Sequence, residues 1–108
     1  PEGYYYLGEL NELKGKKIRA LNNYSLAISK LQGEIDYHIT ESDGLKKMPE
    51  SKVYLKRANL YKTLEEFELM CEDYQTALQL MEKEPNYSGK DLVLKELEEK
   101  ILSDCSDN

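Results

Sequence analysis

Residues 4–27 read YYYLGELNELKGKKIRALNNYSLA, and residues 54–77 read YLKRANLYKTLEEFELMCEDYQTA. When the two stretches are aligned with a shift of 50 positions, aromatic residues fall on aromatic residues and small residues fall on small ones. The matched pairs are Tyr4 and Tyr54, Gly8 and Ala58, Tyr24 and Tyr74, and Ala27 and Ala77. This agreement predicts one supersecondary unit that the chain uses twice.

The first copy predicts two helices joined by a short turn. The apolar residues of its opening helix are Tyr4, Leu7, Leu10 and Leu13. The pattern stops at Lys14-Gly15-Lys16, where a glycine between charged residues is typical of a turn. A second stripe, with steps of three or four, consists of Ile18, Leu21, Tyr24, Ile28, Leu31, Ile35 and Ile39. Because it continues past Gly33, we expect this helix to run to about residue 40, and a break at Gly33 is the alternative.

The second copy predicts another pair of helices, and one more helix follows it. Met48-Pro49 opens the pair, because proline is well tolerated in the first turn of a helix. The apolar stripes of the pair are Val53, Leu60, Tyr61 and Leu64, then Phe67, Met70, Tyr74, Ala77, Leu78 and Met81. Pro85 ends the second of these helices, and Ser88 is expected to cap the last helix. The apolar face of that last helix is Leu94, Leu97, Ile101 and Leu102.

These elements predict an all-α fold without strands, in a single domain over residues 1–108. At 108 residues and 12.6 kDa the chain has room for one domain only. The expected divisions are repeat one at about 2–40, a linker at 41–48, repeat two at about 49–84, a capping helix at about 89–103 and a frayed tail at 104–108. Since the chain begins at Pro1 instead of Met, we expect a fragment of a longer protein.

Composition and charge exclude several classes of function. The 15 basic and 21 acidic residues give a net charge of −6, which disfavours binding to nucleic acid. No apolar run approaches the roughly 20 residues of a membrane span, and no signal peptide opens the chain. Cys71 and Cys105 lie far apart in the sequence and form no CxxC motif, which favours a reducing compartment. We therefore expect a cytoplasmic protein.

Residues suited to catalysis or metal binding are scarce. A Ser-His-Asp or Cys-His arrangement would have to use His38, the single histidine, and no glycine-flanked serine accompanies it. With the two cysteines it makes three scattered candidates for a zinc site, which needs three or four ligands at close spacing. No glycine-rich phosphate-binding loop occurs. We expect no enzymatic activity, no cofactor and no metal.

The repeated unit resembles the tetratricopeptide repeat, a 34-residue helix-turn-helix with a degenerate signature of aromatic, small and leucine positions. The matching residues of the first copy are Tyr4, Leu7, Gly8, Gly15, Ala20, Tyr24 and Ala27. Those of the second copy are Tyr54, Ala58, Tyr61, Phe67, Tyr74, Ala77 and, slightly late, Pro85. Arg57 departs from the usual leucine, Met70 from alanine and Asn11 from tyrosine. The spacing of 50 leaves about 16 extra residues between the copies, which a longer second helix and a loop at 42–47 would absorb.

The resemblance implies a short right-handed superhelix whose first helices line a groove for a peptide or a partner helix. Small residues are expected where the two helices of a unit approach closely, at Gly8, Ala20, Ala27, Ala58 and Ala77. The implied groove residues are Tyr5, Glu9 and Glu12 from the first copy, and Lys52, Lys56, Asn59, Lys62 and Thr63 from the second.

The stretch Lys52-Val-Tyr-Leu-Lys56 is similar to the third repeat of co-chaperone domains. In those domains two cations one turn apart grip the carboxylate end of a heat-shock chaperone, through charge-assisted hydrogen bonds. Other clamp positions carry Tyr5 and Glu9 here, so the chain has half of such a clamp. The alternative is that both lysines are solvated and pair with Glu50 or Glu12.

Two functional hypotheses follow. The first is a protein-interaction module that binds a peptide or a C-terminal tail of another protein, with a heat-shock chaperone as one candidate partner. The second is a structural or self-associating scaffold without a peptide clamp, in which Tyr5 and Tyr6 are exposed anchors and Tyr4 lies in the core. Neither hypothesis involves nucleic acid or a membrane span.

Overall fold

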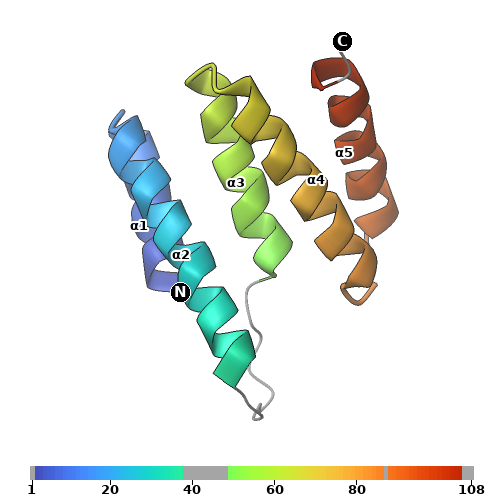
Figure 1. Cartoon of the computed structure of the whole chain (residues 1–108), viewed down its shortest axis with the longest axis horizontal. Helices are drawn as coiled ribbons and strands as arrows, with labels where there is room; N and C mark the ends of the chain where they lie inside the picture. The colour runs from blue at the N-terminus through green and yellow to red at the C-terminus, as the bar shows by residue number, and fades with distance from the viewer. Residues whose placement is uncertain (1, 38–48, 87, 106–108) are drawn as a thin grey trace.

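The computed structural model describes residues 2–37, 49–86 and 88–105, and every regular element within these ranges is an α-helix. The helices are α1 (Glu2–Leu13), α2 (Lys17–Tyr37), α3 (Glu50–Thr63), α4 (Phe67–Lys83) and α5 (Lys90–Asp104). They follow one another across the molecule from the α1–α2 pair to α5 (Figure 1). The predicted all-α class is therefore confirmed, while His38 and the predicted linker at 41–48 lie outside the described residues.

The structure confirms that the second helix continues past Gly33 and corrects the start of the last helix. Helix α2 runs through Gly33 without interruption to Tyr37, so the alternative of a break at Gly33 is wrong. Ser88 does not cap α5, because the N-cap position belongs to Gly89, whose backbone is left-handed (φ 89°) and which has no side chain to accept a hydrogen bond.

The two hairpins turn in the same way, 50 residues apart. In the first turn the amide of Lys16 donates to the Asn11 carbonyl at 2.8 Å, and Gly15 has a φ of 78°. In the second turn the amide of Glu66 donates to the Tyr61 carbonyl at 2.9 Å, and Glu65 has a φ of 62°. The left-handed residue lets the last carbonyls of each opening helix find backbone donors. One supersecondary unit is thus used twice.

Each helix packs mainly on its neighbours in the chain: α1 on α2, α2 on α3, α3 on α4 and α4 on α5. The small residues lie at the close approaches, as expected. Ala20, Ala27, Ala58 and Ala77 are fully buried. A Cβ atom added at Gly8 would lie 2.5 Å from a ring carbon of Tyr24, so glycine is required there. Larger side chains fill the remaining core; among them Tyr24, Tyr74, Met70 and Val53 are fully buried.

The predicted apolar stripe of the first helix is wrong in part. Tyr5 is 2% exposed and belongs to the core, whereas Leu10 and Leu13 are 45% and 85% exposed. Ile18 and Phe67, which were expected on buried stripes, are also exposed. For the leucines of α1 the cause is the linear packing order, because α1 packs extensively on α2 alone and nothing in the described chain covers its opposite face.

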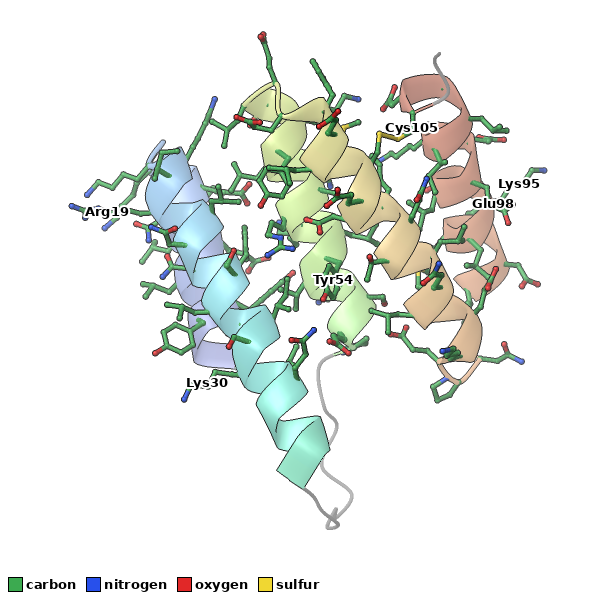
Figure 2. The ribbon with its side chains drawn as sticks, viewed as in Figure 1. Arg19, Lys30, Tyr54, Lys95, Glu98 and Cys105 are labelled. Atoms are coloured by element: carbon green, nitrogen blue, oxygen red, sulfur yellow. A yellow bond between two sulfur atoms is a disulfide. The ribbon has the colours of Figure 1, made fainter. Side chains whose placement is uncertain are left out.

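Cys71 in α4 and Cys105, directly after α5, are joined by a disulfide (Figure 2), with 5.8 Å between their Cα atoms. Two cysteines that lie far apart in the sequence therefore meet in the fold. The two cysteines are separated by 34 positions in the sequence, and the link holds the end of α5 beside the first turns of α4. In the residues that the structure describes, no helix combines the length and apolar character needed to cross a membrane.

Candidate interaction face of α1, α3 and α5

The residues expected to line a groove lie on α1 and α3, and α5 extends the same surface. We call this surface the α1–α3–α5 face. Contacts between helices define it: ion pairs join α3 to α1 and α3 to α5, and a lysine of α3 lies over an aromatic ring of α1. Its residues are Tyr5, Glu9, Glu12, Lys52, Leu55, Lys56, Asn59, Lys62, Val93 and Asp104.

Lys56 is held by two carboxylates of α1. Its Nζ lies 3.5 Å from Glu9 Oε2 and 3.7 Å from Glu12 Oε1. The hydroxyl of Tyr24 donates to the same Glu12 oxygen at 2.7 Å. Burial of Tyr24, together with this bond to Glu12, raises the pKa of its hydroxyl. The alternative of a Lys56–Glu12 pair is confirmed, and an incoming carboxylate would have to compete with both acids for Lys56.

Lys62 of α3 forms an ion pair with α5. Its Nζ lies 3.3 Å from Asp104 Oδ2 of α5, and the pKa of Asp104 is lowered by a hydrogen bond from Ser103 and by Lys62. One turn away, the Tyr74 hydroxyl donates to Asn59 Oδ1 at 3.0 Å. Lys62 therefore ties α3 to α5, and Asn59 ties α3 to α4.

Lys52 differs from the other two lysines. Its Nζ lies over the ring of Tyr5, 5.4 Å from the centroid, and it pairs with no carboxylate among the described residues. The expectation that Tyr5 is an exposed anchor is wrong, because its ring is packed against Tyr24 and buried. Burial, followed by the nearby Glu9, raises the pKa of the Tyr5 hydroxyl. Tyr6 is 57% exposed, as expected, and meets Tyr5 edge-on.

A largely apolar pocket of about 380 Å³ opens beside Lys52. It lies between the first turns of α3, the end of α4 and the start of α5. Its lining residues are Pro49, Ser51, Lys52, Leu55, Met81, Glu84 and Val93.

The polar atoms in the pocket wall already have partners. Ser51 Oγ donates to the Glu84 carboxylate at 2.9 Å, and the buried Lys90 donates to the Glu84 carbonyl. The open wall therefore suits an apolar side chain, and Lys52 at its edge supplies a positive charge. Our sequence reasoning missed Leu55, although it matches Tyr5 at the shift of 50.

Arg57, the departure from leucine in the repeat signature, has a structural role. Its guanidinium makes two hydrogen bonds to Asp73, at 2.7 and 2.9 Å, and a third to Ser25 Oγ at 3.1 Å. The bonds to Asp73 raise its pKa further. Its charge also lies over the rings of Tyr54 and Tyr61. Arg57 thus joins α2, α3 and α4 from within and is not available to a ligand.

Over residues 2–37, 49–86 and 88–105 no group of three or more His, Cys, Asp and Glu side chains could hold a metal ion. No protein-family model, curated protein or solved structure matches the chain.

Proposed function

We propose that this chain is a protein-interaction module of the tetratricopeptide-repeat type, which binds a short segment of another protein on the α1–α3–α5 face. An apolar side chain of the partner enters the pocket beside Leu55, and a neighbouring carboxylate pairs with Lys52. One observation carries the proposal: an apolar pocket adjoins the one groove lysine that has no carboxylate partner among the described residues.

The ligand chemistry differs from that of a two-cation clamp. Because Glu9 and Glu12 occupy Lys56, a single cation remains for the partner's acid, and the apolar anchor contributes the rest of the affinity. The proposed partner is therefore a peptide with an apolar residue next to an acidic residue or a terminal carboxylate. An acidic tail of a heat-shock chaperone is one such ligand.

The Cys71–Cys105 disulfide bears on where the module works. The cytoplasmic expectation drew on two distant cysteines without a CxxC motif, whereas a disulfide persists mainly in oxidising compartments. The cysteines therefore no longer favour a cytoplasmic location, and we propose an oxidising compartment instead.

Fluorescence anisotropy tests the binding proposal with a labelled peptide that ends in leucine and two acidic residues. A version with a C-terminal amide tests the recognition of the terminal carboxylate. A version with serine in place of leucine tests the recognition of the apolar side chain. Acidic chaperone-tail peptides form a third arm. We expect micromolar binding that weakens about tenfold or more in Lys52→Ala and in Leu55→Gln.

Lys30→Ala is the matched control, because Lys30 is exposed on α2, which contributes no residue to this face, and lies at the outer edge of the molecule (Figure 2). It should bind like the unmodified chain. Binding that survives both Lys52→Ala and Leu55→Gln would overturn the proposed site. Binding to chaperone tails alone would narrow the ligand class to those tails.

A further inference from the structure

Helix α1 carries an uncovered apolar stripe. Tyr6, Leu7, Leu10 and Leu13 are 57%, 44%, 45% and 85% exposed. At 100° per residue these four side chains fall within one third of the helix circumference. We call this stripe the α1 open face. A stripe of large apolar side chains along one helix is the geometry with which a second helix is bound.

A group of basic residues adjoins the α1 open face. Lys14, Lys16, Lys17 and Arg19 lie in the turn to α2 and in its first residues, and all four are exposed. No carboxylate in the described chain forms a salt bridge with any of them. Arg19 points outward from the α1–α2 end of the molecule (Figure 2). We call these four residues the basic turn.

The opposite end of the molecule is acidic. Helix α5 exposes Asp91, Glu96, Glu98 and Glu99, and none of them is in a salt bridge with a described residue. Leu92 on the same helix is 61% exposed. Glu98 and Lys95 point outward at the α5 end, far from Arg19 (Figure 2).

The distribution of charged residues along the sequence is also uneven. Of the 15 basic residues, eleven precede residue 65, whereas 13 of the 21 acidic residues follow residue 64. The basic turn and the exposed acidic residues of α5 have opposite charges, and exposed leucines lie near each of them.

We propose that the α1 open face and the basic turn bind the outer face of α5 of a second copy, so that chains associate head to tail. The apolar stripe of α1 then covers Leu92 of the neighbour, while the basic turn lies opposite Glu96 and Glu99, which share one face of α5 with Leu92. The linear packing order continues across the contact, with α5 of one copy against α1 of the next. This goes beyond peptide binding, because it uses neither Lys52 nor the pocket beside Leu55.

Such a contact joins two different surfaces, so each added copy leaves one free surface of each kind. Association should therefore grow with protein concentration beyond a dimer. It should also weaken with salt, since the charges are exposed and screened by ions.

Sedimentation velocity of the whole chain, over about a hundredfold range of concentration at low and high salt, measures this association. Two charge-reversed variants separate the ends. The first carries Lys16→Glu, Lys17→Glu and Arg19→Glu, and the second carries Glu96→Lys and Glu99→Lys. Each alone should weaken association at least about tenfold. Lys30→Glu is the control and should associate normally.

An equimolar mixture of the two variants should associate again, because each altered end now complements the altered end of the other variant. Far-UV circular dichroism shows that both variants are folded. A chain that stays monomeric at every concentration overturns the proposal. Normal association of the α5 variant by itself also overturns it, since that result assigns the contact to two α1 helices. Neither result bears on the peptide titration.

Discussion

The guanidinium of Arg57 in α3 makes two hydrogen bonds to the Asp73 carboxylate in α4, with its Nε 2.7 Å and its Nη2 2.9 Å from the two acid oxygens. The Asp73 side chain is only 6% exposed. In the first hairpin the matching positions, 50 residues earlier, are Leu7 and Asn23. One hairpin thus has a buried ion pair where the other has an apolar and a neutral residue.

Removing the cation alone should be costly. Arg57→Leu leaves the Asp73 carboxylate buried without its partner, and we expect the free energy of unfolding to fall by about 3–5 kcal/mol. The double variant Arg57→Leu/Asp73→Asn copies the first hairpin and should recover most of that loss. Chemical denaturation measures both variants. A loss below about 1 kcal/mol in the single variant would show that the pair contributes little.

Gly8 and Gly3 lie on the same helix, but substitution of each by alanine is expected to have opposite effects on stability. Gly8→Ala drives a methyl group into the Tyr24 ring and should destabilise the fold by about 1–3 kcal/mol. Gly3→Ala meets no atom within 4 Å and should stabilise it by about 0.5–1 kcal/mol. Thermal and chemical unfolding compare the two variants. Equal effects would contradict the close approach of α1 and α2.

Glu65 occupies a left-handed backbone position, with a φ of 62°, that the first hairpin fills with Gly15. A residue with a Cβ atom is strained in that conformation. Glu65→Gly should therefore raise the free energy of unfolding by about 0.5–1 kcal/mol, and Gly15→Glu should lower it by a similar amount. Unfolding in urea provides the comparison. A loss of stability in Glu65→Gly would refute the shared turn geometry.

The disulfide should hold α5 in place. Reduction, or the double variant Cys71→Ser/Cys105→Ser, removes a link across 34 residues and should lower the free energy of unfolding by roughly 3–4 kcal/mol. Amide hydrogen exchange should speed up more in α5 than in α1, because the disulfide ties the end of α5 to α4 and does not involve α1. An equal increase in both helices would indicate that the link stabilises the whole chain and not α5 in particular.

Local patterns predicted the helices and the repeat well. The Gly15 turn, the fully buried alanines and the five helices follow from spacing and residue size, which depend on neighbours close in the chain. The exposure of Leu10 and Leu13 could not be predicted in this way. An apolar stripe shows that a helix has a face to cover, but the linear packing order decides whether anything covers it.

The candidate site was predicted in part. The sequence places Lys52, Lys56 and Lys62 on one helix, α3, but their partners come from α1 and α5, which sequence spacing does not relate to α3. The disulfide was missed for the same reason, because only the packing of α5 on α4 brings its cysteines together. The shift of 50 that matches Tyr5 with Leu55 would have revealed the pocket wall.

The most direct test of the central claim is a titration of the isotopically labelled chain with the leucine-containing acidic peptide, followed by amide NMR. We predict that the largest shifts occur at Lys52, Leu55 and Val93, and that they vanish in Lys52→Ala. Largest shifts at the α1 open face, or no shifts at millimolar peptide, would contradict a binding site on the α1–α3–α5 face.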